Sequence, residues 1–234
     1  ASDVYKRQRC ASGAIRWYVP ISTRPRTSLV QASTLRLTRL LLLPFFQIDF
    51  CKFRRETVGI GMSYLDRYLC TPRGRPSLLK RKEYQLAAMT ALYIAIKLHE
   101  PLEMETSLLA DLSRGCYTEM EFVEMEQIML AALQWKMNGP TALQFAQHYL
   151  TFLPESVSES VVEAVFDYTR YQIELAVADQ SFVPLRMSDV GLAAVLNAME
   201  GIDTNLLPLK VQSRFIRSVE RRCSTVMEDV VIIQ

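Results

Sequence analysis

The sequence predicts an all-α protein built from two similar halves. No segment of its 234 residues shows the sustained apolar and polar alternation that is typical of strands. Apolar residues recur instead at spacings of three and four, the pattern of helices with one buried face. The tripeptide Asn138-Gly139-Pro140 is the strongest break in the chain. A small-residue apolar helix is expected on each side of it, over residues 86–100 and residues 188–199.

The first of these halves is expected to include a helix over residues 55–70, which Pro72 ends. Gly59 and Gly61 weaken this helix slightly, but glycine also permits a neighbouring helix to approach closely. Residues 71–82 are rich in Pro, Gly and basic side chains and are expected to form a solvated loop. The positions of the helix that we expect to be buried are Val58, Met62, Leu65 and Leu69.

Residues 86–100, LAAMTALYIAIKLHE, are expected to form the central helix of this half. They are almost wholly apolar, and Pro101 prevents the helix from continuing. A short helix is expected around residues 107–113. A longer one follows over residues 117–137, where Thr118 and Glu121 have the Thr-x-x-Glu spacing of a capping box.

The second half is expected to repeat this arrangement. Residues 141–150 predict a short helix, residues 156–178 a long amphipathic helix, and residues 188–199 a small-residue apolar helix. A last amphipathic helix is expected over residues 208–227. For the long helix, the residues expected to be buried are Val161, Val165, Tyr168, Ile173 and Val177.

Residues 1–34 differ from the rest of the chain. They contain six basic side chains and one acidic side chain, Asp3, and show no helical or strand periodicity. The string DVYKRQ at residues 3–8 resembles the translation of a transposase end used in sequencing-library preparation, so we expect this segment to be irregular, and either artefactual or disordered. The alternative is a basic arm for nuclear targeting or for nucleic acid. Residues 35–49 could form a helix, which Pro44 would kink or end.

Composition argues against several classes of function. The chain has 27 Lys and Arg against 25 Asp and Glu, a net charge of +2, which does not indicate a nucleic-acid or membrane-surface binder. Its five cysteines contain no C-x-x-C pair and it has only two histidines, so we expect no metal, no cofactor and no disulfide framework. The longest apolar run, residues 40–46, is too short for a membrane helix. The expected location is the nucleus, the cytoplasm or both.

Two charges stand out inside apolar rows. Lys97 follows Tyr93 and Ile94 at helical spacing, and Glu126 shares a helix face with Phe122. A charge in such a row is costly unless it is paired. From spacing alone, the two residues either pair with each other, extend to water, or face a partner protein.

Three motifs resemble the cyclin box: YLDRYL at residues 64–69, TALYIAIKLHE at residues 90–100 and YTEMEFVEMEQIMLAALQW at residues 117–135. NGPTALQFAQHYL, which follows, resembles the entry into a second cyclin fold. The resemblance implies two tandem five-helix repeats, with an N-terminal box over residues 35–137 and a C-terminal fold over residues 138–234. The first helix of the first repeat is expected to be incomplete or divergent, because residues 36–40, RLTRL, depart from the family's pattern.

The resemblance also implies a function. Cyclins are non-catalytic regulatory subunits that bind a cyclin-dependent protein kinase, position its regulatory helix and so activate it in cell-cycle control. Gln85 matches the edge of the family's recruitment patch for protein substrates, and an exposed helix-start glutamine is an equally good interpretation. Asp66 matches a structural residue that pairs with an arginine of the first helix. The positions that match the kinase-binding surface are Lys97, Leu98, His99, Glu100, Glu126, Leu130, Trp135 and Met137.

Other classes of function fit the sequence less well. A cyclin-fold transcription adaptor resembling transcription factor IIB should have a zinc ribbon and a basic second half, whereas acids such as Glu159 and Glu163 keep this half mixed in charge. An enzyme should show a Gly-rich phosphate loop, a nucleophile elbow or paired carboxylates, and none is found. An inactive cyclin-like fragment remains a further alternative, given the divergent residues 1–50.

Overall fold

The structure is a computed structural model that describes residues 6–9, 15–18, 53–101, 104–179 and 182–223. The chain separates into two compact units between Gly139 and Pro140, inside the predicted Asn138-Gly139-Pro140 break. Among these described residues, the regular structure is helical apart from a short hairpin near the N-terminus, which confirms the predicted fold class. No helix in this described part of the chain is long and apolar enough to cross a membrane.

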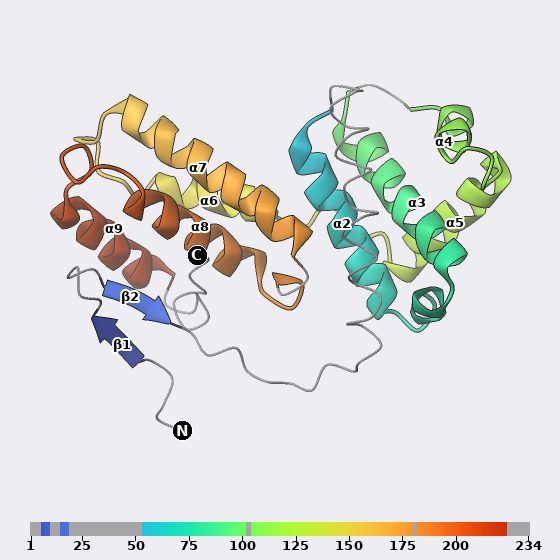
Figure 1. Cartoon of the computed structure of the whole chain (residues 1–234), viewed down its shortest axis with the longest axis horizontal. Coiled ribbons are helices and arrows are strands. Elements are labelled where there is room, and N and C mark those ends of the chain that lie inside the picture. The colour runs from blue at the N-terminus through green and yellow to red at the C-terminus, as the bar shows by residue number, and fades with distance from the viewer. Residues whose placement is uncertain (1–5, 10–14, 19–52, 102–103, 180–181, 224–234) are drawn as a thin grey trace. The chain divides into compact units, whose positions relative to one another are not determined.

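The first half has four described α-helices, α2 (Arg55–Cys70), α3 (Arg81–His99), α4 (Thr106–Leu112) and α5 (Glu119–Ala132), and the 3₁₀ helix η1 (Arg75–Leu79) (Figure 1). Helix α2 has the predicted bounds. Helix α3 begins five residues earlier than predicted, so the expected loop contains both η1 and the first residues of α3. The helix predicted over residues 35–49 lies outside the described residues.

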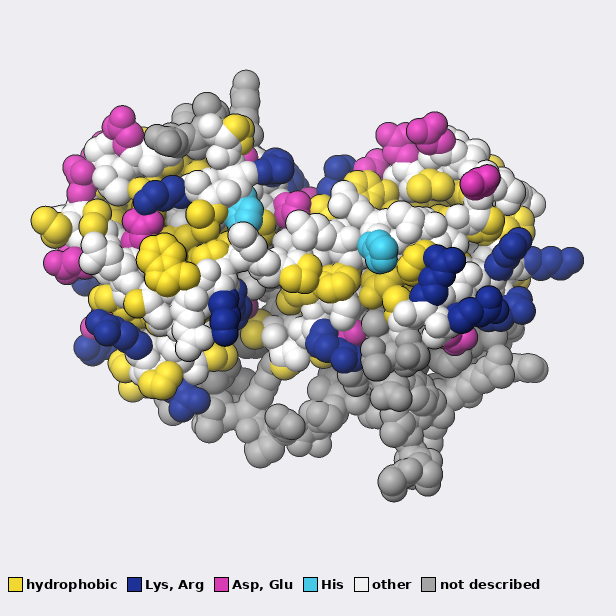
Figure 2. Space-filling view, turned by 180° about the vertical axis from the view of Figure 1, so that it is seen from behind, with side chains coloured by type: hydrophobic (Ala, Val, Ile, Leu, Met, Phe, Trp, Pro, Cys, Tyr) yellow, Lys and Arg dark blue, Asp and Glu magenta, His cyan; other side chains and the backbone are white. Residues whose placement is uncertain are grey.

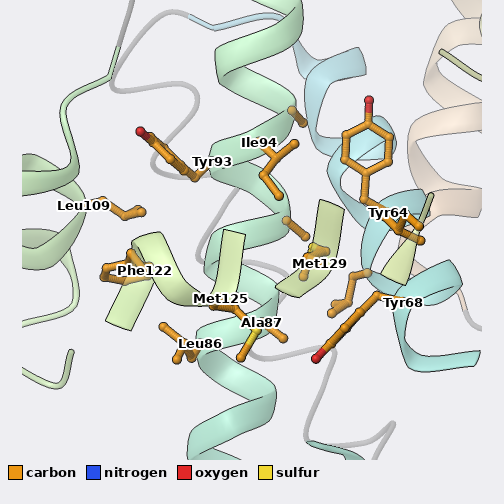
Figure 3. Close-up of a cluster of buried hydrophobic side chains, with 14 of the residues drawn as sticks. Tyr64, Tyr68, Leu86, Ala87, Tyr93, Ile94, Leu109, Phe122, Met125 and Met129 are labelled. Carbon is orange, nitrogen blue, oxygen red and sulfur yellow. The ribbon is translucent and has the colours of Figure 1, made fainter. Parts of the chain in front are cut away.

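Helix α3 is the centre of the first half. A Cβ added at Gly61 of α2 would lie 3.1 Å from the Cα of Leu92, so α2 packs closely against α3, as predicted for this glycine. On α3 itself, Ala87, Ala91 and Ala95 are buried and allow its neighbours to approach. Figure 3 shows the side chains that gather around α3, among them Tyr64 and Tyr68 from α2 and Phe122, Met125 and Met129 from α5.

The second half has four described α-helices, α6 (Ala142–Leu150), α7 (Glu159–Ala178), α8 (Met187–Glu200) and α9 (Leu209–Arg222). Helix α8 is the central one, with both α6 and α7 packed on it (Figure 1). Residues 189–196 of α8 are all buried, as expected for a helix surrounded by others. Its core partners include Tyr149, Val165 and Phe215.

Gly191 makes the close packing of α8 against α6 possible. A Cβ at this position would lie 2.5 Å from the carbonyl oxygen of Ala142, a distance at which backbone must move. We expect Gly191→Ala to lower the free energy of unfolding by about 1–3 kcal/mol because of this overpacking. Gly201→Ala is the matched control, since its nearest new neighbour would lie at 3.5 Å. Thermal unfolding measures both variants, and equal stability of the two would contradict this account of the packing.

Three further predictions of local structure were wrong. The strands β1 (Lys6–Arg9) and β2 (Ile15–Tyr18) form an antiparallel hairpin where only irregular structure was expected. Ile, Trp and Tyr in β2 are good strand formers, but four residues are too few to show alternation. The other residues of the 1–34 segment lie outside the described part, so its artefactual or disordered nature stays a prediction. Tyr168 of α7 is 55% exposed rather than buried, and Thr169 is buried in its place. Helix α5 ends at Ala132, five residues earlier than predicted.

Candidate kinase-binding surface

Lys97 and Glu126 form an ion pair between the last turn of α3 and the middle of α5. The Lys97 Nζ donates a hydrogen bond of 2.8 Å to the Glu126 Oε1. This bond raises the pKa of Lys97 above its usual value, so the lysine is charged at neutral pH. The Lys97 Nζ also lies 5.2 Å from the centre of the Tyr93 ring, close enough for a cation–π interaction. The pairing of the two charges, one of the alternatives left open by their spacing, is therefore present.

The pair nevertheless keeps hydrogen-bonding capacity that faces solvent. The Lys97 side chain is 48% exposed and that of Glu126 is 14% exposed. An ammonium group has three donors, and a carboxylate has two acceptor oxygens. Among the described residues, the Glu126 Oε2 has no hydrogen-bond partner. The pair can therefore offer a donor and an acceptor, side by side, to the backbone of another protein.

Two large apolar side chains lie exposed at the same end of the first half. Leu98 is 51% exposed beside Lys97, and Trp135 is 72% exposed after the end of α5. The Tyr64 hydroxyl connects the two segments that carry them. It lies 3.0 Å from the Nε2 of His99, which follows Leu98, and it donates at 2.8 Å to the carbonyl of Met137, two residues after Trp135. Since a tyrosine has one hydroxyl proton, the His99 Nε2–H is the donor in the other bond. Leu130, half-buried, lies one turn after Glu126 on α5.

Trp135 is held in an unusual backbone conformation. Gln134 and Trp135 have positive φ angles of 54° and 58°, in the left-handed region that non-glycine residues rarely occupy. The Trp135 N–H donates to the Leu130 carbonyl at 3.0 Å. The Arg67 Nη2 donates to the Lys136 carbonyl at 2.5 Å. Together with the Tyr64 bond to Met137, these contacts fix a turn that keeps the indole in solvent while the next residues return to the core.

Three of the predicted contact residues direct their side chains inward. Met137 is buried in the core of the first half. The His99 ring bonds to Tyr64, as described above. The Glu100 side chain is 4% exposed and caps the first turn of α2, where it accepts hydrogen bonds from the Arg54 backbone N–H at 3.0 Å and from the Thr57 hydroxyl. The surface available to a partner therefore consists of Lys97, Leu98, Glu126, Leu130 and Trp135.

Sequence reasoning missed the residues that support this surface. Tyr64 and Arg67 both lie in the YLDRYL motif, yet only Asp66 of that motif was assigned a role. The signal that could have found Tyr64 is the amphipathic pattern of α2, which places this residue on the buried face. A buried tyrosine hydroxyl usually has a hydrogen-bond partner, so a bond to a neighbouring segment could have been predicted. The capping box of α5, in contrast, was predicted and is confirmed: Thr118 and Glu121 bond reciprocally.

Asp66 is largely buried on α2, and Gln85 is half-buried on α3. Burial raises the pKa of Asp66 from 3.8 to about 6. Its charge in turn contributes to the raised pKa of the Tyr84 hydroxyl, for which burial is the larger cause. No hydrogen bond or ion pair of Asp66 is found among the described residues, and residues 36–40, where the resemblance implies the first helix with its arginine, lie outside them.

The raised pKa of Asp66 predicts a pH-dependent stability. Between pH 3.8 and about 6 the folded state holds a proton that the unfolded state releases, so the free energy of unfolding falls as pH rises. The full loss, present above pH 6, is on the order of 3 kcal/mol. We therefore expect Asp66→Asn to raise the free energy of unfolding by about 1–3 kcal/mol at pH 7.5 and to remove this pH dependence. Urea unfolding at several pH values measures both effects. Lower stability of Asp66→Asn at pH 7.5 would show instead that an arginine neutralises the carboxylate.

Comparison with known proteins agrees with this fold. Residues 47–138 match the family model of the cyclin N-terminal domain. The chain is 24% identical over 152 residues to mouse G1/S-specific cyclin-D1, covering 65% of this chain and 49% of that protein. It is 32% identical over 164 residues to the G1/S-specific cyclin CLN3 of Candida albicans, covering 67% of this chain and 34% of that protein. The chain thus spans about half the length of cyclin-D1.

Two solved structures share the fold. A viral cyclin from herpesvirus saimiri aligns with a TM-score of 0.55 at 22% identity, over 85% of this chain and 87% of that one. A chain of the CAK complex from Chaetomium thermophilum, bound to ATP-gamma-S, aligns with a TM-score of 0.56 at 15% identity, over 90% and 66% of the two chains. At these identities the likeness shows the fold. The match of residues 47–138 to the family model, together with the cyclin relatives, supports a cyclin-box family member.

Proposed function

We propose that this chain is a non-catalytic regulatory subunit that binds and activates a cyclin-dependent protein kinase. The observation that carries the proposal is the solvent-facing Lys97–Glu126 pair beside the exposed Leu98 and Trp135. An exposed tryptophan and leucine next to a partly desolvated charge pair have the composition of a protein interface. The names of the relatives, which include G1/S-specific and G2/mitotic-specific cyclins, support a role in cell-cycle control.

The charge pair suits the backbone of a helix end. The end of a helix leaves carbonyl or N–H groups without partners within the helix. Lys97 can donate to such a carbonyl and the Glu126 Oε2 can accept from such an N–H, while each charge keeps its present partner. Leu98 and Trp135 would bury their exposed area against apolar residues of the same kinase helix.

Activation then follows from preferential binding. A kinase is active when its regulatory helix lies inward and its glutamate pairs with the catalytic-site lysine. A subunit that binds this inward position more tightly than the outward one shifts the population toward the active state. In this proposal the chain acts in the nucleus, the cytoplasm or both, without nucleic acid, membrane or cofactor. Protein substrates of the kinase would be recruited in part through the region of Gln85.

Co-expression with a kinase that has a PSTAIRE-like regulatory helix tests the proposal. We expect a stable complex, and phosphorylation by that kinase that depends on the chain. Failure of the full chain to copurify with any such kinase would contradict the proposal and favour an inactive cyclin-like fragment.

Trp135→Ala tests the apolar part of this surface. Removing the indole is expected to weaken kinase binding by about 1–2 kcal/mol, or roughly five- to thirtyfold, because its buried area in the complex is lost. Met120→Ala, which removes an exposed apolar side chain at the opposite end of α5, is the matched control and should leave binding unchanged. Isothermal titration measures both. An equal effect of the two variants would show that Trp135 does not belong to the interface.

A further inference from the structure

Helix α9 has a row of basic side chains along one face. Lys210, Arg214, Arg217 and Arg221 follow one another at spacings of four, three and four residues, so they share one face of the helix. All four are exposed. At a rise of 1.5 Å per residue, the row extends over about 16 Å. Figure 2 shows Lys and Arg side chains gathered over the part of the second half that contains α9.

These charges are not neutralised within the described part of the chain. None of the four side chains makes an ion pair there; Arg217 only donates from its Nε to the Ser213 carbonyl at 3.2 Å. Like charges three and four residues apart on a helix repel one another. The row therefore lowers the stability of α9 slightly and is left open to an anionic partner.

The rest of α9 makes this row a rigid surface. Phe215 and Val219, on the opposite face, are fully buried in the core of the second half. Arg222 lies outside the row, with its guanidinium 4.8 Å from the centre of the Phe152 ring. Two exposed leucines, Leu206 and Leu209, lie at the N-terminal end of the row.

We propose that this basic face of α9, defined by Lys210, Arg214, Arg217 and Arg221, binds an acidic segment of a partner protein. In an extended peptide, alternate side chains lie about 6.6 Å apart, close to the roughly 4.5–6 Å rise between successive charges of the row. Leu206 and Leu209 would contact an apolar residue at one end of that segment. A protein partner fits better than nucleic acid, because the chain has a net charge of only +2 and these leucines offer nothing to phosphates.

Fluorescence anisotropy with the full chain tests this proposal. The probe is a fluorescein-labelled peptide of two leucines followed by a run of glutamates, at low salt. We expect Arg214→Glu with Arg217→Glu to weaken peptide binding by about tenfold or more, and added salt to weaken wild-type binding. The same exchange at Arg73 and Arg75, two exposed arginines of the first half, changes the net charge equally and should have little effect.

Folding and binding can be separated in this experiment. Glutamates at positions 214 and 217 attract Lys210 and Arg221 across one turn, so thermal stability should be unchanged or higher while peptide binding is lost. Equal effects of the two double variants, or no peptide binding by the wild type, would overturn the proposal. Tighter binding of a short DNA duplex, or of vesicles that contain phosphatidylserine, would overturn the assignment to a protein partner. Kinase binding through the first half is measured separately and does not decide this outcome.

Discussion

Phe122→Ala is expected to lower the free energy of unfolding of the first half by about 3–5 kcal/mol. Phe122 of α5 is fully buried in the core of the first half (Figure 3). The centre of its ring lies 5.8 Å from that of the edge-on Tyr117 ring. Its removal costs the transfer free energy of a phenyl group and leaves a cavity that rigid helices cannot close. For a chain of marginal stability, this is a large part of the total. Urea unfolding followed by circular dichroism measures the loss.

Gln127→Ala is the matched control for Phe122→Ala. Gln127 is exposed on the same helix, where alanine is at least as good a helix former. Its replacement should change the free energy of unfolding by less than about 0.5 kcal/mol. If Phe122→Ala proved equally mild, the first half would not have the tightly packed core described here.

Lys97→Glu is expected to weaken kinase binding by about 2–5 kcal/mol, or at least thirtyfold. The variant removes a donor from the interface and places two carboxylates, those of positions 97 and 126, next to each other. Burying them under a partner is costly because neither retains a counter-charge. The affinity of the purified chain for the kinase, measured by isothermal titration, checks this. Lys80→Glu, in an exposed ion pair with Glu83 at the other end of α3, is the control that should leave binding intact.

Helices with strong patterns were predictable from the sequence. The bounds of α2 followed from its apolar spacing and from Pro72, and the start of α5 from the Thr118–Glu121 capping box. Such features depend on residues close together in the chain, so local physical chemistry decides them. Gly61 was also predicted correctly as a point of close approach, because few other reasons place glycine inside a helix.

The end of α5 depends on distant contacts and could not be predicted. Residues 133–137 contain no glycine or proline, so nothing local stops the helix at Ala132. The turn that contains the left-handed Gln134 and Trp135 is fixed by Tyr64 and Arg67, which donate to the carbonyls of Met137 and Lys136 from about seventy residues earlier in the chain. The same limit applies to Glu100, which resembles a surface residue in sequence but caps α2 through Thr57 and Arg54. Residue types at the site were therefore predictable, whereas their orientation required the fold.

The most direct test of the proposed surface exchanges its two charges. Lys97→Glu combined with Glu126→Lys restores an ion pair within the first half but inverts the polarity that a partner meets. We expect the double variant to unfold at the wild-type temperature and still to bind the kinase at least thirtyfold more weakly, as the single Lys97→Glu variant does. Recovery of wild-type affinity in the double variant would contradict the account, since it would show that Lys97 and Glu126 serve only each other.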